Sequence, residues 1–292
     1  MTQSSSFRAL LQRGEMIVAP GAYDCITAKL IEQAGFAAVY MTGAGTAASL
    51  GYPDFGLVTM SEMVVNAGRL VAAVEVPVVA DADTGYGNEL NAVRTVREFE
   101  SRGVAGIHIE DQVFPKKCGH LEGKEIIPRE DYLAKIRAAI AARRDSNFAI
   151  IARTDARAVA GLDEAITRAN AALTAGADMA FVEAPQTEEE VTAVPRLVNG
   201  PCLLTVVRGG KTPDIDLRRA EALGYKLAIV PGLLIKGVVG ICDKMLSELK
   251  STHRHPPSVK EMTLPDMFRR FGADEWDALR ERFCGPLRNA AE

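Results

Sequence analysis

Short apolar runs alternate with amphipathic segments along most of the chain. The runs are rich in valine, isoleucine and alanine and lack polar alternation, which is typical of parallel strands buried on both faces. Each run ends in polar or glycine-rich residues. We expect eight strands, which lie within MIVAPGAYD, AAVYMTG, PVVADAD, GIHIED, FAIIARTDA, DMAFVEAP, PCLLTVVRGG and KLAIVPG.

Segments with helical spacing of apolar residues follow most of these strands. Glycine stands just after several of them, as is common where a helix ends. A short helix is also expected in the polar N-terminal segment. The other predicted helices are Cys25–Gln33, Ser61–Val74, Glu89–Arg102, Glu130–Arg143, Leu162–Ala175, Ile215–Leu223, Leu234–Leu249 and Pro265–Phe283.

The alternation of eight strands with helices predicts an α/β protein, a (β/α)8 TIM barrel. An open doubly wound sheet is the alternative, but its polar residues would gather at one switch point. Here they follow nearly every strand, as in a barrel. With 292 residues, of which 48% are hydrophobic, we expect residues 1–292 to form a single barrel domain. Residues 234–292 would be a C-terminal helical extension that packs on the barrel or on a neighbouring subunit.

The charge and the cysteines narrow the classes of function. A formal net charge of -4 without a basic cluster argues against a nucleic-acid partner and against an electrostatic membrane anchor. No apolar run approaches the roughly 20 residues that span a bilayer. The five cysteines lack paired spacing, and the N-terminal residues lack the apolar core of a signal peptide. We therefore expect a cytoplasmic protein that acts on a small molecule, with no membrane partner.

Carboxylates stand at the ends of two neighbouring strands. Asp81 and Asp83 follow the third run, and Glu110 ends the fourth. Because the carboxyl ends of barrel strands meet at one face, these three acids are expected to lie close together. Hard oxygen ligands suit Mg2+ or Mn2+, held partly through water. The alternative is that the acids cap helices or pair with lysines.

A long loop follows Glu110 and runs to Pro128. A loop of this length is uncommon unless it closes over a site or binds something. Within it Cys118 stands beside Lys116, Lys117 and His120, whose positive charge is expected to favour the thiolate. The alternative is an ordinary cysteine on a solvated basic turn.

Two further features indicate carboxylate binding. Arg153 ends an apolar strand, so it is expected to pair with an acid such as Glu183, to bind a substrate carboxylate, or both. The turn Thr42–Gly45 offers backbone amides for another carboxylate, although its glycines can equally serve a tight turn. The following loop, Ala44–Val58, is long enough to line a site.

A set of motifs in fixed order resembles the isocitrate lyase and phosphoenolpyruvate mutase superfamily. The motifs are MTGAG, GYPDFG, VADADTGYG, IEDQ, KKCGH, IARTDA and FVEAP, and the resemblance spans Ala19 to about Gly232. KKCGH is similar to the loop of the carbon-carbon lyases. The resemblance implies an Mg2+-dependent barrel whose eighth helix is exchanged between the subunits of a homotetramer. It also implies cleavage of a 2-hydroxy acid to an oxo acid and a carboxylate enolate.

The resemblance also implies roles for individual residues. Cys118 would be the general acid that protonates the enolate, flanked by Lys117, Gly119 and His120 in the catalytic loop, with Glu183 behind the site. The oxo-acid carboxylate would be held by Thr42, Gly43, Ala44 and Arg153. The acids of the metal site would be Asp54, Asp81, Asp83 and Glu110.

Three positions depart from the lyase pattern, and all touch the half of the pocket expected to hold the enolate-derived product. They are Thr205, Arg208 and Lys236. A smaller or differently charged leaving half is therefore expected, as in 2,3-dimethylmalate or another alkylmalate, with pyruvate or glyoxylate as the oxo acid. Arg208 and Lys211 can instead meet a larger acyl group or phosphate.

Other functions remain open from the sequence. Hydrolysis or decarboxylation of oxaloacetate would use the same metal acids. Phosphonate mutase or hydrolase chemistry is disfavoured by KKCGH. A ligand-binding barrel without activity is the non-enzymatic alternative, against which the acids and Cys118 are all present together.

Overall fold

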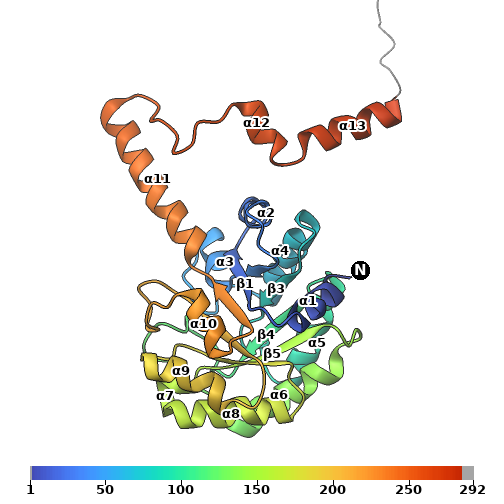
Figure 1. Ribbon diagram of the computed structural model, residues 1–292, viewed down its shortest axis with the longest axis vertical. Coiled ribbons are helices and arrows are strands. Elements are labelled where there is room, and N and C mark those ends of the chain that lie inside the picture. The colour runs from blue at the N-terminus through green and yellow to red at the C-terminus, as the bar shows by residue number, and fades with distance from the viewer. Residues whose placement is uncertain (1, 285–292) are drawn as a thin grey trace, which may run out of the picture. The chain divides into compact units, whose positions relative to one another are not determined.

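Eight parallel strands close into a barrel in the computed structural model, which describes residues 2–284 (Figure 1). Every strand pairs with its neighbours in chain order, and the first pairs with the last, so the predicted (β/α)8 fold is confirmed. The strands are β1 (Ile17–Ala22), β2 (Val39–Met41), β3 (Val78–Asp81), β4 (Gly106–Glu110), β5 (Ala149–Thr154), β6 (Met179–Val182), β7 (Cys202–Thr205) and β8 (Leu227–Val230).

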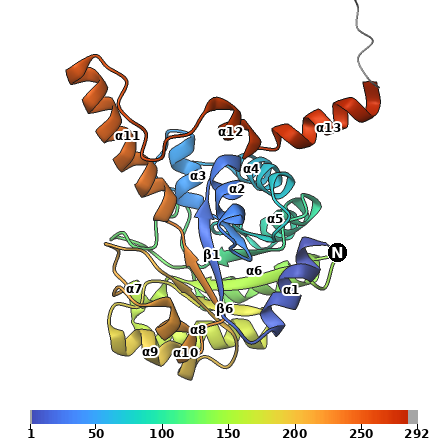
Figure 2. The same ribbon diagram turned by 45° about the horizontal axis from the view of Figure 1, so that its top comes forward.

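Helices cover the outside of the barrel. Their apolar faces pack on the outward side chains of the strands in two clusters, one around β1 to β5 and one around β6 and β7. In both views α8, α9 and α10 lie side by side (Figure 2). Up to the eighth strand the helices are α1 (Gln3–Gln12), α2 (Cys25–Gln33), α3 (Gly43–Ser49), α4 (Met60–Ala73), α5 (Glu89–Ser101), α6 (Arg129–Ala142), α7 (Ala156–Ala160), α8 (Leu162–Thr174), α9 (Glu188–Leu197) and α10 (Leu217–Leu223).

Helix α1 closes the amino end of the barrel. Phe7 is fully buried among the inward side chains of the strands. The Gln3 side chain accepts a hydrogen bond from the backbone N–H of Val78, at the start of β3. Arg8 forms an ion pair of 2.7 Å with Asp178, just before β6. With this end closed, the carboxyl end of the barrel is the face left for a site.

Three helices lie where none was predicted: α3, the short α7 after β5, and α9. The expected loop Ala44–Val58 begins as helix α3, capped by the Thr42 hydroxyl, which accepts a hydrogen bond from Gly45. Helix α9 follows the sixth strand, with Thr187 as its cap and three glutamates in its first turn, which suit the positive end of the helix dipole. Pro195 inside α9 disguises its helical pattern.

The C-terminal segment is helical but divides differently from the prediction. Helix α11 (Leu233–Thr252) is followed by α12 (Leu264–Arg269) and α13 (Ala273–Cys284). The single predicted helix Pro265–Phe283 is wrong, because Gly272 takes a φ of 91°, in the left-handed region, and ends the helical run.

The chain separates into two units, Met1–Gly237 and Val238–Glu292. The first holds the whole barrel. The second holds most of α11 with α12 and α13, and none of the described residues of these three helices is buried. Among the described residues, no helix is long and apolar enough to cross a membrane.

Candidate active site

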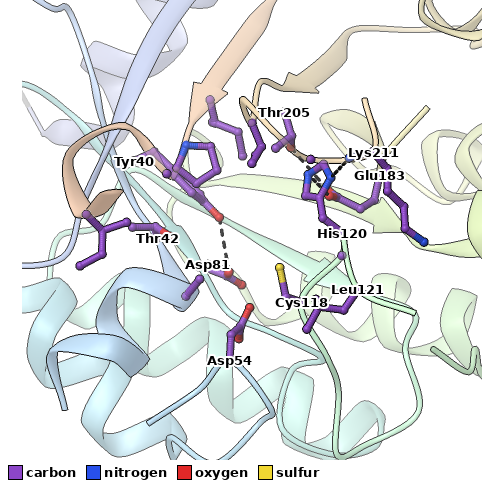
Figure 3. Close-up of a pocket in the computed structure, with 18 of the residues that line it drawn as sticks. Tyr40, Thr42, Asp54, Asp81, Cys118, His120, Leu121, Glu183, Thr205 and Lys211 are labelled. Carbon is purple, nitrogen blue, oxygen red and sulfur yellow. Dashed lines mark hydrogen bonds and ion pairs between the residues drawn. The ribbon is translucent and has the colours of Figure 1, made fainter. Parts of the chain in front are cut away.

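A cavity of about 450 Å3 opens at the carboxyl end of the barrel (Figure 3). It is lined by residues at the ends of β2, β3, β5, β6, β7 and β8 and by the loop after β4. Nearly all of the sequence-predicted residues lie in its wall or directly behind it. Those in the wall are Thr42, Ala44, Asp54, Asp81, Cys118, Gly119, His120, Arg153, Glu183 and Thr205.

The predicted metal acids are buried at the ends of β3 and β4. Asp81 lines the cavity, whereas Asp83 and Glu110 are absent from its wall. Glu110 is fully buried, and its Oε1 has no hydrogen-bond partner. Burial and nearby negative charge raise the Glu110 pKa well above its usual range, and burial raises the pKa of Asp83 to about 6. A bound cation would stabilise the charged form of these buried carboxyl groups. Carboxylate oxygens are also the ligands that a hard divalent ion prefers.

No ready-made metal site is present, however. Among the described residues, no three acidic, histidine or cysteine side chains form a group that could hold a metal ion directly. The expected close convergence of Asp81, Asp83 and Glu110 is therefore not seen. Carboxylates that bind the ion partly through water, as Mg2+ prefers, need no such group.

Lys116 lies between two of the predicted metal ligands, Asp54 and Asp83. Its ammonium nitrogen lies 2.5 Å from Asp54 Oδ1 and 2.7 Å from Asp83 Oδ1. Burial opposes the charge on Lys116, but Asp83, Glu110 and Asp54 together raise its pKa well above its usual range. The positive charge of Lys116 is thus paired with Asp54 and Asp83, two of the predicted metal ligands.

The prediction of a Cys118 thiolate is wrong. Burial raises the Cys118 pKa above its usual value, against a hydrogen bond from the His120 backbone that lowers it. The expected cations face elsewhere: Lys116 pairs with acids, and Lys117 is exposed and donates to the carbonyl of Gly123. Cys118 keeps its proton at neutral pH, as a proton donor must.

Arg153 is held by a ring of acids. Its Nε lies 2.9 Å from Asp155 Oδ2, 3.1 Å from Glu110 Oε2 and 3.8 Å from Glu183 Oε2. The expected pair with Glu183 is present but is the longest of the three. These acids raise the Arg153 pKa well above its usual range in spite of burial. Arg153 lines the cavity as a permanently charged group in a fixed position.

The turn at Thr42 brings backbone N–H groups to the cavity. The N–H of Gly43 donates to Asp81 Oδ2 at 3.2 Å. An added Cβ at Gly43 would collide with the Asp81 carboxylate, so glycine is required by this approach. Thr42 and Ala44 line the cavity on either side. The turn therefore orients Asp81, and the N–H groups of Gly43 and Gly45 both donate to side chains of the protein itself.

Two predicted residues lie outside the cavity. The Lys117 side chain is directed to the outer surface of the loop. Arg208 is exposed and is absent from the cavity wall; its carbonyl oxygen accepts a hydrogen bond of 2.6 Å from Lys236 Nζ. Lys236 itself lines the cavity. The sequence correctly predicts that Arg208 follows β7. It does not predict that the side chain is absent from the cavity wall.

Sequence reasoning missed the groups beneath and around the acids. The Tyr40 hydroxyl lies 2.8 Å from His108 Nε2 and donates to Asp81 Oδ2 at 3.4 Å. Both residues sit inside apolar strands, where only a polar interruption of the run marks them. Lys211 and Lys236 also line the cavity, and an apolar part of the wall carries no chemical signal in the sequence. The apolar residues are Leu121, Phe181, Val207, Ile229, Pro231 and Ile235.

Lys124 ties the loop to Arg153 from behind. Its ammonium nitrogen lies 2.7 Å from Asp155 Oδ1 and donates to the carbonyl of Gly119. Because Asp155 also holds Arg153, one carboxylate fixes both the arginine and the residue that follows Cys118.

Comparisons with known proteins agree with this geometry. The family described as phosphoenolpyruvate phosphomutase matches residues 7–250. The chain is 51% identical over 232 residues to 2,3-dimethylmalate lyase of Eubacterium barkeri, covering 79% of this chain and 80% of the relative. It is 44% identical over 242 residues to 2-methylisocitrate lyase of Aeropyrum pernix, covering 83% and 78%.

Solved structures show the same likeness. A crystal structure of 2,3-dimethylmalate lyase has a TM-score of 0.93 at 38% identity and covers 100% of this chain and 99% of its own. Oxaloacetate acetylhydrolase in complex with 3,3-difluorooxalacetate has a TM-score of 0.94 at 34% identity and covers 98% of each chain.

Proposed function

The chain belongs to the phosphoenolpyruvate mutase and isocitrate lyase superfamily, and from this premise we propose that it cleaves an alkylmalate. Its similarity to named lyases makes it a carbon-carbon lyase. The first candidate substrate is 2,3-dimethylmalate, after the relative that is 51% identical. The metal, the acid and the substrate below are parts of the proposal.

The proposed reaction breaks the bond between C2 and C3 of the 2-hydroxy acid. The hydroxyl proton is lost, C2 becomes the carbonyl of an oxo acid, and the bonding electrons stay on C3 as a carboxylate enolate. The enolate then takes one proton. For 2,3-dimethylmalate the products are pyruvate and propionate, which balances atoms and charge.

The observation that carries the proposal is the position of the Cys118 thiol in the cavity wall. Burial keeps the proton on sulfur until a stronger base forms beside it. An enolate is such a base, so Cys118 can transfer its proton to C3.

The oxo-acid half is proposed to lie against Arg153 and the turn at Thr42. Arg153 offers a fixed guanidinium to the carboxylate of C1, and Thr42 and Ala44 line the cavity beside it. Positioning by two such groups aligns the breaking bond with the acids below.

Mg2+, or Mn2+, is the proposed cofactor. Asp54 and Asp81 line the cavity and would face the ion, with Asp83 and Glu110 supporting it from behind. The bound ion supplies a Lewis acid that stabilises the negative charge developing on the oxo-acid half. The buried unpartnered Oε1 of Glu110 supports this choice.

The apolar wall favours an alkyl-substituted leaving half. Val207, Ile229, Pro231 and Ile235 line the cavity and form an apolar part of its wall. Methyl groups gain free energy against such a wall, whereas a further carboxylate would lose its hydration there. Thr205 remains as the hydroxyl on this side, 3.4 Å from Glu183 Oε2.

Hydrolysis of oxaloacetate is the second candidate. It is favoured by the structural likeness to oxaloacetate acetylhydrolase. The sequence identity is lower than for the lyases, and the apolar part of the wall has no methyl group of oxaloacetate to contact.

A coupled assay separates the two. Lactate dehydrogenase reports pyruvate or glyoxylate released in the presence of Mg2+ from 2-alkylmalates, 2,3-dimethylmalate, methylisocitrate and isocitrate. Oxaloacetate is followed directly by its absorbance. Release from an alkylmalate supports the lyase; loss of oxaloacetate with no release from any hydroxy acid rejects it in favour of the hydrolase.

We also propose that the chain assembles as a homotetramer in which the C-terminal helices pack on a neighbouring subunit. Large apolar side chains are exposed on α12 and α13, including Phe268 at 55% and Trp276 at 71%. Such a surface needs a partner, and a second copy of the chain is the occupant we propose. The free thiol of Cys118 suits a cytoplasmic setting, which keeps cysteines reduced.

A further inference from the structure

The turn after β7 has no role in the proposed reaction, although it lines the cavity. Val207, Gly209, Gly210 and Lys211 belong to its wall, while Arg208 faces outward. The turn lies opposite the catalytic loop, and Figure 3 shows Lys211 beside His120.

One hydrogen bond joins the two segments. The backbone N–H of Lys211 donates to His120 Nδ1 at 3.0 Å. The ring also lies directly against Gly210, where an added Cβ would be 2.7 Å from Nδ1 and 3.0 Å from Cε1. Only glycine therefore permits the ring to occupy this position.

This bond fixes the proton on the His120 ring. Because Nδ1 accepts, a neutral ring carries its proton on Nε2. Nε2 lies 3.2 Å from Glu183 Oε1, close enough for electrostatic attraction, although no hydrogen bond forms between them. A second contact supports the pairing, since Lys211 Nζ lies 2.7 Å from Glu122 Oε1 in the same loop as His120.

His120 lies in the same tight turn as the proposed proton donor. The backbone N–H of Leu121 donates to the carbonyl of Cys118 at 2.9 Å and closes the turn that contains Gly119 and His120. A displaced His120 ring would therefore shift the backbone of this turn, of which Cys118 is the first residue. The turn after β7 is thus connected to Cys118 through the His120 ring and the hydrogen-bonded turn.

We propose that Gly210 and the backbone N–H of Lys211 are a positioning element for the proton donor: they hold the His120 ring, and through it place the Cys118 thiol over the enolate carbon. The proposal rests on the proposed lyase function. Gly210 and Lys211 are positioning residues that do not touch the reacting atoms.

The test compares Gly210→Ala with Glu122→Ala. Alanine at position 210 displaces the ring, whereas Glu122→Ala removes only the exposed ion pair with Lys211. For Gly210→Ala we expect kcat to fall by about 100-fold, because small misplacements of a reacting group have effects of this size. KM is expected to change little, since Arg153 and Thr42 are untouched, and Glu122→Ala should stay near wild type.

A second pair of variants tests the acceptor on the ring. The side-chain oxygen of His120→Asn can accept the N–H of Lys211 in place of Nδ1, whereas His120→Ala cannot. We expect asparagine to restore part of the kcat that alanine loses. Equal activity of the two variants would contradict a role through this hydrogen bond.

Amide hydrogen exchange gives a readout without turnover. In Gly210→Ala and His120→Ala, peptides covering residues 118–121 and 207–211 should lose protection together, while Glu122→Ala and His120→Asn keep it. Unchanged protection and unchanged kcat in Gly210→Ala would overturn the inference. If wild type cleaves no hydroxy acid but the two peptides respond together, the lyase proposal fails and the link between the segments stands.

Discussion

Lys116 Nζ lies 2.5 Å from Asp54 Oδ1, so a residue of the catalytic loop neutralises an acid of the proposed metal site. The same ammonium lies 2.7 Å from Asp83 Oδ1. When the loop covers the cavity, Lys116 therefore also neutralises the buried carboxylates of Asp54 and Asp83. A loop that moved away would leave both carboxylates without their cation.

Removal of this cation should lower stability. We expect Lys116→Met to cost about 3 kcal/mol, because buried acids lose their partner. Mg2+ should restore part of the loss by replacing the missing charge. Thermal unfolding with EDTA and with Mg2+ measures both effects. Lys117→Met, at the exposed neighbour, should change the free energy of unfolding by less than about 0.5 kcal/mol. An equal loss in both variants would contradict the role assigned to the ion pairs.

Loss of the thiol should remove turnover without affecting binding. Cys118→Ser replaces an acidic proton donor by a much weaker one, and we expect kcat to fall by about 100- to 10,000-fold. Binding of an oxo-acid product, followed by calorimetry, should be unchanged. Cys25→Ser, remote from the cavity, is the control. Wild-type turnover of Cys118→Ser would reject this residue as the acid.

The contact between His120 and Lys211 should depend on pH. Burial lowers the His120 pKa, aided by Arg153 and Lys124 and opposed by Glu183 and Asp155. The ring therefore stays neutral in the folded protein through the usual histidine range, and Nδ1 remains an acceptor. Below its lowered pKa the ring gains a proton on Nδ1, which then faces another donor, the N–H of Lys211.

Hydrogen exchange checks this expectation. Protection of the Lys211 amide, corrected for the intrinsic exchange rate, should persist near neutral pH and fall as the pH drops below the histidine range. The unfolded chain takes up the proton first, at its ordinary pKa near about 6.5, so stability also falls from that point downward. Protection that rises on acidification would contradict this tautomer.

The apolar wall should determine the size of the alkyl group. Val207 lines the cavity, whereas its neighbour Val206 packs in the outer core. Val207→Ala removes two methyl groups from the wall, so a longer alkyl chain should gain relative to methyl. We expect the ratio of kcat/KM values to shift by about 10-fold. Val206→Ala should leave this ratio unchanged. If both variants shifted the ratio equally, the side chain of Val207 would not determine the selectivity.

A charge in the C-terminal apolar surface should disrupt assembly. Trp276 is 71% exposed, and its burial in a subunit contact would contribute about 2 kcal/mol per copy. Trp276→Glu should lower the mass measured by light scattering at micromolar concentration. Glu281→Gln, on the same helix, is the control. A monomeric wild type would reject the tetramer outright.

The barrel is predictable from the sequence because its strands are buried on both faces. Runs such as FAIIAR have no polar alternation, a pattern that strands with one solvent-facing side do not show. Helix α3 escapes detection because glycines interrupt its sequence, although Thr42 caps it. Helix α9 escapes because Pro195 lies inside it.

The site is predictable in its residue types but not in its directions. Asp81 and Glu110 are recognisable as acids at strand ends. Lys116, Lys117 and Cys118 are neighbours in sequence, yet one side chain pairs with acids, one lies on the surface and one faces the cavity. The direction of each side chain depends on the backbone conformation of the loop, which cannot be read from the residue types alone.

Helix α1 closes one end of the barrel while the catalytic loops occupy the other. Phe7 contributes to the core from the closed end, whereas Val207 faces the cavity at the opposite end. Divergence of substrate preference can therefore proceed through the loops while the closed end of the fold is inherited unchanged. Enzymes built in this way can acquire new reactions through changes in the loops, without a change of fold.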